Sequence, residues 1–295
     1  MKFLSKYIFG TGGGSLAEIV TGGGTANLEL TERASMHVFD RNVQVTVAAT
    51  DGGTDLNRIT TIGTVNRQTR ILTVLGGGNW HADYSAGRHV HLRGGVNNCI
   101  NGFASWFPTT APGATAHFGV NRTLDSRLYG VIRTVDTSVD TNIEEACVSL
   151  LADVADQGGM VDALIMNTRA LRQFIKQLGS KVTYDKFNAI GADGDEVDVS
   201  FKTVKIIGET GEVDVIGDRN CPYGLVYALQ KKGAVLISAG PMIGFLTYED
   251  DDNKFVRHGA ENAMEARIGG YLQFAHQTPG FCGVMDITDL LDAED

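Results

Sequence analysis

Hydrophobic and polar positions follow two different patterns along the chain, and the pattern changes near residue 130. The first part contains short segments in which apolar and polar residues alternate, as at Val43, Val45 and Val47. Glycine-rich turns separate these segments. Ile71–Leu75 and His89–Leu92 are further segments of this kind. Short β-branched runs broken by glycine about every ten residues are typical of a small β-barrel or β-sandwich.

From about Asp136 the spacing becomes that of helices. Thr141 and Glu144 stand in the positions of a capping box, and the pair Gly158-Gly159 is placed to end the helix that follows. The sequence therefore predicts a helix between them, with one buried stripe. The stripe consists of Ile143, Ala146, Cys147, Leu150, Leu151 and Val154.

A buried strand over 161–166 precedes Asn167, which is placed to cap a second helix. The apolar stripe of that helix is Leu171, Phe174, Ile175 and Leu178, and Gly179 ends it. Further strands are predicted over 203–207, 212–216, 224–229 and 235–237. Apolar and polar residues alternate from Met264 to Phe274, which favours one more strand. The fold class is α+β.

The composition indicates a folded protein rich in turns and strands. Of the 295 residues, 43% are hydrophobic and 20% are charged, which argues against disorder and supplies a sizeable core. The length fits about two domains. Glycine accounts for 37 residues and proline for 5, without the three-residue period of collagen.

Charge and cysteine content narrow the partners and the compartment. The net charge of −10 argues against a general nucleic-acid binder. No apolar run reaches the ~18 residues of a membrane span. Lys6 interrupts the stretch that a signal peptide would need, so we expect a soluble chain that is not secreted by that route. We expect reduced, largely buried thiols at the four widely spaced cysteines, Cys99, Cys147, Cys221 and Cys282.

Three clusters invite a chemical interpretation, and each has a simpler one. The run from Gly10 to Ser15 lacks the third glycine of a dinucleotide site and the Lys-Ser/Thr of a phosphate loop, so it predicts a flexible turn. His89 and His91 share one face of a strand and, with His81, suggest zinc. A fourth ligand is missing, which favours solvated or hydrogen-bonded histidines. The acidic runs 193–196 and 249–253 do not match a calcium loop and predict surface loops, with Ca²⁺ or Mg²⁺ bridging between subunits as the alternative.

The sequence singles out no catalytic, cofactor-binding or metal-binding residue. It contains no G-x-S-x-G elbow, no local Cys–His signature and no carboxylate pair that stands out. We therefore predict that the protein is not an enzyme. The enzyme alternative would require a pocket that joins His89, His91 and Asp83.

Four segments, in order, resemble parts of the tailed-bacteriophage major capsid proteins. They are the helix NIEEACVSLLADVADQGG (142–159), the strand, Asn and helix VDALIMNTRALRQF (161–174), the strand and turn VDVIGDRNCP (213–222), and the closing strand ARIGGYL (266–272) with the turn TPGF (278–281). Each motif alone is weak, and their order carries the resemblance, which covers about 130–287.

The resemblance implies the Hong Kong 97-type capsid fold, with an axial and a peripheral domain. Members of that family form hexamers and pentamers that close into an icosahedral shell around double-stranded DNA. The implied partners are therefore copies of the chain itself and packaged DNA bound without sequence specificity, with portal, scaffolding or cementing proteins as further partners and no membrane. The implied location is the virion, after assembly in the host cytoplasm.

The first third departs from the family, because nothing in 1–130 resembles its long spine helix. We expect 1–14 to be a remnant of the arm and spine junction, 15–100 an inserted β-barrel or sandwich-like domain, and 101–295 the capsid core. Within that core, the axial domain covers about 140–250 and the peripheral strands 251–290. The arm, loop and spine are then missing or supplied by another chain. The alternatives are an encapsulin-like nanocompartment shell and another virion or tail protein.

Overall fold

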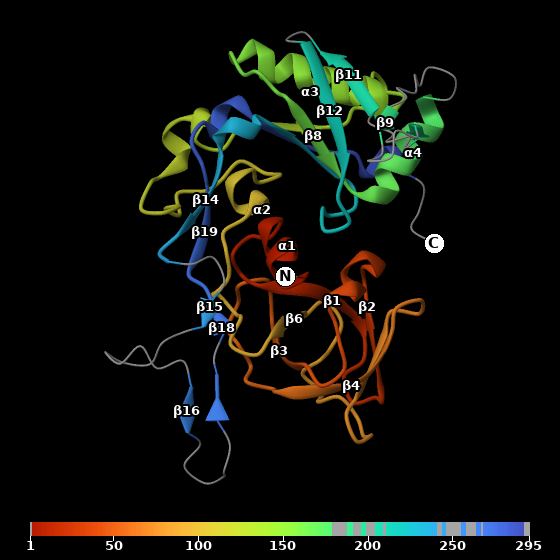
Figure 1. The fold of residues 1–295 in the computed structure, drawn as a ribbon, viewed down its shortest axis with the longest axis vertical. Helices are drawn as coiled ribbons and strands as arrows, with labels where there is room; N and C mark the ends of the chain where they lie inside the picture. The colour runs from red at the N-terminus through yellow and green to blue at the C-terminus, as the bar shows by residue number, and fades with distance from the viewer. Residues whose placement is uncertain are drawn as a thin grey trace.

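A closed barrel of six strands forms the N-terminal part of the computed structural model, which describes residues 2–178, 188–190, 196–198, 204–208, 211–240, 244–245, 255–257, 264–266 and 268–291. The strand order is β1-β2-β5-β4-β3-β6, and β6 pairs with β1 to close the barrel (Figure 1). The strands are β1 (Ser15–Thr21), β2 (Asn27–Leu30), β3 (Gln44–Ala48), β4 (Thr60–Asn66), β5 (Ile71–Val74) and β6 (His89–Leu92).

Two aromatic side chains fill the barrel core together with aliphatic residues from the strands. Trp80 and Tyr84 are fully buried, with ring centroids 4.8 Å apart. Their polar atoms find partners, because Trp80 Nε1 donates to the Leu72 carbonyl at 3.2 Å and the Tyr84 hydroxyl donates to the Arg58 carbonyl at 2.6 Å. Burying large rings with satisfied polar ends stabilises a small barrel.

A six-stranded mixed sheet forms the second unit, in the order β11-β12-β8-β13-β20-β7. The pairs β12–β8 and β20–β7 are parallel and the others antiparallel. Two helices, α3 (Ile143–Asp156) and α4 (Thr168–Leu178), pack their apolar stripes on one face. The strands are β7 (Val131–Thr134), β8 (Ala163–Met166), β11 (Val204–Gly208), β12 (Gly211–Gly217), β13 (Leu225–Leu229) and β20 (Gly283–Asp286).

The other face of this sheet carries an aromatic cluster that joins it to the N-terminal part. Along β13, Val226 and Ala228 face the helices, whereas Tyr227 belongs to the opposite cluster. There it meets Phe9, which follows helix α1 (Lys2–Ile8), and Phe103, which opens helix α2 (Phe103–Trp106). Strand alternation thus buries both faces of the sheet.

A two-stranded ribbon runs alongside the barrel (Figure 1). Its pairs, from the sheet outward, are β14 (Ala234–Ser238) with β19 (Leu272–His276), β15 (Gly244–Phe245) with β18 (Ile268–Gly269), and β16 (Val256–Arg257) with β17 (Met264–Glu265). The prediction of one continuous strand from Met264 to Phe274 is therefore wrong. The described residues form three short strands that pair successively with different partners.

The predicted helices and most strands are confirmed, with one correction at a helix start. All six residues of the first predicted stripe are buried in α3, and Asn167 Oδ1 accepts from the Arg169 amide, as a cap should. The capping box is wrong, because the Thr141 amide and hydroxyl donate to Glu145 rather than to Glu144, at 2.9 and 2.6 Å. Gln177 of α4 accepts instead from the Ile143 amide at 3.0 Å, so a neighbouring helix satisfies the first turn.

Three sequence predictions concern residues that lie wholly or partly outside the described part of the chain. Gly179, predicted to end the second helix, and the acidic run 249–253 lie outside the described residues. So does most of the run 193–196, of which Glu196 begins β10 (Glu196–Asp198), paired with β9 (Asn188–Ile190). Among the described residues, no helix has the length and hydrophobicity needed to cross a bilayer.

Candidate assembly surfaces

The ribbon exposes large hydrophobic side chains along its length. Met264 and Tyr271 are the most exposed, at 75% and 74% of their full area. Phe245 and Phe255 place their rings 6.2 Å apart, so the apolar positions are partly clustered. In the part of the chain that the structure describes, β14 and β19 pair only with each other, which leaves an unpaired edge on each strand. Exposed apolar side chains beside unpaired strand edges are typical of a surface that another chain covers.

An open cleft of about 1070 Å³ lies where α1, the barrel and the six-stranded sheet come together. Ser5 and Ile8 of α1 line one wall, and Arg67 contributes from the turn after β4. The opposite wall is Thr168 at the start of α4 and the turn 217–220 after β12. The cleft is therefore built from three segments that are far apart in the sequence.

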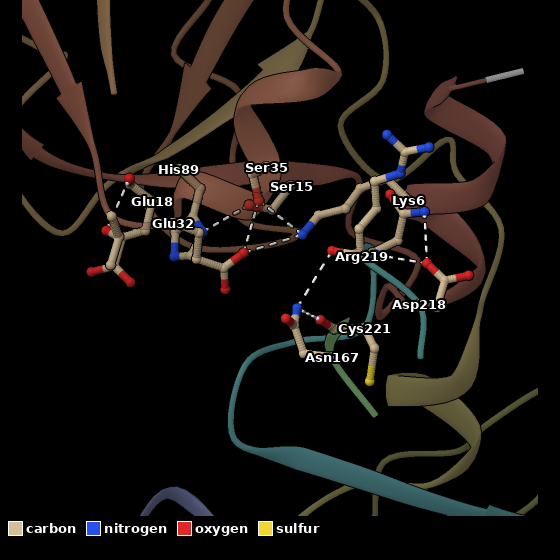
Figure 2. A network of polar contacts seen from close by, with 12 residues as sticks. Lys6, Ser15, Glu18, Glu32, Ser35, His89, Asn167, Asp218, Arg219 and Cys221 are labelled. Atoms are coloured by element: carbon tan, nitrogen blue, oxygen red, sulfur yellow. Dashed lines mark hydrogen bonds and ion pairs between the residues drawn. The ribbon is translucent and has the colours of Figure 1, made fainter. Parts of the chain in front are cut away.

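Lys6 fixes α1 against the barrel beside this cleft (Figure 2). Its Nζ lies 3.3 Å from Glu32 Oε2 and 3.0 Å from Ser35 Oγ, in the short 3₁₀ helix η1 (Arg33–His37) and its cap. Ser35 Oγ also donates to Glu32 at 2.8 Å, and Ser35 is fully buried. Because the ammonium group and both acceptors are held together, the wall formed by α1 is fixed relative to the barrel.

The turn after β12 is organised by two asparagines. Asn167 Nδ2 donates to the Cys221 carbonyl at 2.7 Å (Figure 2), which ties the start of α4 to the turn. Asp218 Oδ1 accepts from the Asn220 amide at 2.7 Å and from Asn220 Nδ2 at 3.0 Å. Asn220 is 5% exposed, and its Oδ1 has no hydrogen-bond partner within the described residues. A buried carbonyl oxygen without a donor is unusual in a folded protein.

The histidines of the zinc hypothesis have different surroundings. Val90 lies in the barrel core, so His89 and His91 share the outer face of β6, as predicted. His89 Nδ1 contacts Ser15 Oγ at 2.9 Å, whereas His91 is buried and neither of its ring nitrogens has a partner among the described residues. Burial lowers the pKa of His91. No group of three or more His, Cys, Asp or Glu side chains suited to a metal occurs in the described parts of the chain.

Asp83, the third residue of the enzyme alternative, belongs to an exposed charge cluster. Arg58 Nε lies 2.7 Å from one carboxylate oxygen and Arg88 Nη1 lies 3.0 Å from the other. Hydrogen bonds from Arg58 and Arg88 hold the pKa of Asp83 below its ordinary value. His81 Nδ1 lies 3.1 Å from the same carboxylate. These contacts give Asp83 a role in holding 81–88 against the loop at Arg58.

The cysteines are free thiols, as predicted, and three of them are buried. Burial raises the pKa of Cys147 and of Cys282 to about 12 and also raises that of Cys221. Cys282 Sγ lies 3.5 Å from His276 Nε2, inside the aromatic cluster. Cys99 is partly exposed, beside a small apolar pocket of about 390 Å³.

The glycine run 10–15 forms a packed turn that leads into β1. A Cβ on Gly13 would come within 2.3 Å of the Gly52 amide nitrogen, so only glycine allows the two loops to meet. The Ser15 amide donates to Asp51 Oδ1 at 3.0 Å across the same contact. The prediction of a turn is confirmed, and its glycines serve close backbone packing.

Sequence reasoning did not single out the cleft residues Arg67, Arg219 and Asn220. Arg219 and Asn220 lie within the strand and turn motif 213–222, but nothing in their spacing indicates that Arg67, about 150 positions earlier, lies across the cleft from them. A site assembled from distant segments leaves no local signature in the sequence.

The comparisons with known proteins give structural similarity at a low level. No protein-family model matches the chain, and no curated protein matches it. Among solved structures, the chain is similar to one described as "Cyanophage A-1(L) capsid asymmetric unit", with a TM-score of 0.43 and 14% sequence identity. The similarity covers 65% of this chain and 61% of that chain, so the chain spans about three fifths of the length of the structure it matches. A similarity at this level does not define a family.

Proposed function

We propose that the chain is the major capsid protein of a tailed bacteriophage, a structural subunit that assembles with copies of itself into an icosahedral shell around double-stranded DNA. The observation that carries the proposal is the ribbon, whose apolar side chains have no cover within the described chain. The ordered motifs from 142 to 281 that resemble the capsid family point the same way.

The energetics of the exposed side chains favour assembly. Burying one large apolar side chain contributes about 1.5–3 kcal/mol, so covering Met264 and Tyr271 with a neighbouring copy is a substantial gain for each contact. Closed symmetry repeats each contact many times, and weak pairwise contacts then suffice to hold a shell. We expect each subunit to bury more than the ~1,600 Å² of a standard pairwise interface.

The barrel has a separate role in this proposal. We assign β1 to β6 to an additional domain on the outside of the shell, where it decorates the surface or bridges neighbouring capsomers. Its compact core and closed sheet allow it to fold without help from the subunit contacts. A map of the shell that places the barrel on the inner wall would contradict this assignment.

The test is the size of the particles that the purified chain forms, by light scattering and negative-stain imaging. We expect closed shells, and we expect Met264→Asp combined with Tyr271→Asp to abolish them while the thermal unfolding of the monomer is unchanged. Leu124→Asp combined with Val139→Asp is the matched control, because both side chains are exposed, at 81% and 65%, and lie outside the ribbon. A chain that remains a small oligomer at all concentrations, or a ribbon variant that assembles like the control, would overturn the proposal. Protein cargo instead of DNA in native particles would identify a nanocompartment.

A further inference from the structure

Strand β14 of the ribbon has a free edge, and the register of its pairing with β19 shows which main-chain groups lie there. Just beyond the pair, the Ala239 amide donates to the Tyr271 carbonyl at 3.1 Å. Hydrogen-bonded and non-hydrogen-bonded pairs alternate along an antiparallel ladder, so the odd-numbered residues of β14 bond to β19 and the even-numbered ones point away from it. The N–H and C=O groups of Leu236 and Ser238 therefore lie on the free edge. Within the described chain, no hydrogen bond engages these groups.

The corresponding edge of β19 is occupied at its centre. Phe274 lies opposite Leu236 in the ribbon, so its main-chain groups point away from β14. Its C=O accepts from Trp106 Nε1 at 3.1 Å, and its N–H donates to Gln273 Oε1 at 3.2 Å. Side chains of the same subunit thus satisfy this edge of β19, whereas the edge of β14 has no such cover among the described residues.

The edges of the six-stranded sheet carry charges, and β14 carries none. That sheet ends in β11, which contains Lys205, and in β7, which contains Arg133. A charged side chain on an edge strand is a common protection against pairing with another chain. The segment 233–240 reads GAVLISAG and has neither a charge nor a proline. An edge that is both unpaired and unprotected is suited to the addition of a further strand.

Charge and hydrogen-bond symmetry favour the same strand of a second copy as the partner. Each copy carries a net charge of −10, so contact between copies is favoured where the contact itself brings no charge, as at 233–240. Antiparallel pairing about a two-fold axis at Ile237 places Leu236 of each copy opposite Ser238 of the other. Every free N–H and C=O group of these two residues then gains a hydrogen bond.

The side chains of β14 suit this register. Leu236 packs with the aromatic cluster, whereas Ile237 lies on the opposite face and is 54% exposed. With the axis at Ile237, the two Ile237 side chains meet in a non-hydrogen-bonded pair, where side chains of neighbouring strands approach most closely. A cross-strand pair of β-branched residues is favourable at such a position. The pairing therefore covers the most exposed apolar side chain of the strand.

We propose that β14 pairs with β14 of a second copy, antiparallel and centred on Ile237, so that two ribbons join into one sheet. The inference rests on the proposed self-assembly and identifies one two-fold contact between subunits. Two five-residue strands bury much less than the ~1,600 Å² of a standard interface. We therefore expect the contact to be weak in dilute solution and to be complete among assembled copies.

Disulfide cross-linking tests both the contact and its register. The background is the full chain with Cys99→Ser, which removes the partly exposed native thiol. On mild oxidation with diamide, Ile237→Cys should form at least tenfold more covalent dimer than Ile207→Cys, both in assembled particles and in concentrated solution. Ile207→Cys is the matched control, because Ile207 is 81% exposed on the charged edge strand β11. A mixture of Val235→Cys and Ala239→Cys should form mixed dimers, whereas neither variant alone should cross-link.

A proline tests the main-chain bonds separately. Ser238→Pro removes an N–H group that points away from β19, so the pairing within the ribbon is retained. It should reduce the cross-linking of Ile237→Cys at least tenfold, whereas Ser238→Ala, which keeps the N–H group, should not reduce it. Thermal unfolding by circular dichroism checks that both variants fold alike. If Ser238→Pro is unstable, the mixture of Val235→Cys and Ala239→Cys decides the register by itself.

The outcomes separate this inference from the proposed function. Equal dimer yields from Ile237→Cys and Ile207→Cys, cross-linking of Val235→Cys with itself, or undiminished cross-linking in a folded Ser238→Pro variant would each overturn the inference. Shells that form without the cross-link at position 237 would refute this inference alone. Cross-linked dimers from a chain that never forms shells would refute only the proposed function, and the absence of both would refute both.

Discussion

Arg133 joins the six-stranded sheet to α3 through ion pairs with the buried Asp140 and the partly exposed Asp153, and its removal gives a sharp test of the packing. Its Nη2 lies 2.9 Å from Asp140 Oδ2, and its Nη1 lies 2.7 Å from Asp153 Oδ2. Ser149 Oγ donates to the other oxygen of Asp140 at 2.9 Å. Asp140 is 1% exposed. Burial alone would raise the pKa of Asp140, but hydrogen bonds from Arg133 and Ser149 outweigh it and leave the pKa lowered.

Arg133→Met keeps the aliphatic stem and removes the charge, which leaves Asp140 buried without its counter-ion. Breaking one partner of a buried pair costs about 3–5 kcal/mol. That is a large part of the roughly 5–15 kcal/mol that separates a folded domain from its unfolded state. Asp153 is 41% exposed, so water replaces the lost contact there. Adding Asp140→Asn should recover much of the loss, because a neutral amide still accepts from Ser149.

The measurement is urea unfolding of the unmodified chain, Arg133→Met, the double variant and Arg127→Met. Arg127 lies 2.6 Å from Asp125 in an exposed pair, and its loss should leave the unfolding midpoint unchanged. Since the folded pKa of Asp140 is lowered, its contribution is complete above its unfolded pKa of about 3.9 and is lost as the pH falls through the folded value. The difference between the unmodified chain and Arg133→Met should therefore narrow below about pH 4. An Arg133→Met midpoint equal to that of Arg127→Met at pH 7 would refute the reasoning.

Three further predictions test other parts of the fold. In the native protein at pH 8, a thiol reagent should modify Cys99 alone, and all four thiols only after unfolding; fast modification of a second thiol would contradict the burial described above. Gly102→Ala should lower the unfolding midpoint, because its Cβ would lie 2.1 Å from the Ile8 carbonyl oxygen, whereas Gly113→Ala, with open space, should not. Trp80→Ala should destabilise the barrel by about 3–5 kcal/mol in fluorescence-detected unfolding, and a loss below 1 kcal/mol would show that the barrel core is not packed as described.

The helices were predictable because their information is local. The stripe from Ile143 to Val154 depends on a spacing of three and four residues, and every predicted position is buried. The capping contact was not predictable, since the side chain that satisfies the Ile143 amide is Gln177, which a second helix brings into place. Local spacing therefore located the helix but could not identify the group that satisfies its first turn.

The barrel and the cleft depend on pairings that no local pattern contains. The β-branched runs separated by glycines were compatible with either a barrel or a sandwich. The pairing of β1 with β6 closes the sheet and identifies it as a barrel. His91 shows the same limit, because alternation places it on the outer face of β6 but cannot show that it is buried there. The cleft depends on the approach of Arg67 to the turn at Arg219, which only the tertiary fold brings about.

The alternation of apolar and polar residues from Met264 to Phe274 is informative, because only some of its apolar positions are buried in the structure. Alternation predicts one buried face, and Phe274 is buried against the aromatic cluster as that pattern requires. Ten residues earlier in the same segment, Met264 is 75% exposed. Met264 continues the apolar alternation, yet in the single chain its side chain is exposed to water. Folding of the single chain does not require an apolar side chain at such a position. The pattern therefore describes burial that the single chain does not complete, and a covering chain along the ribbon is the simplest physical account of it.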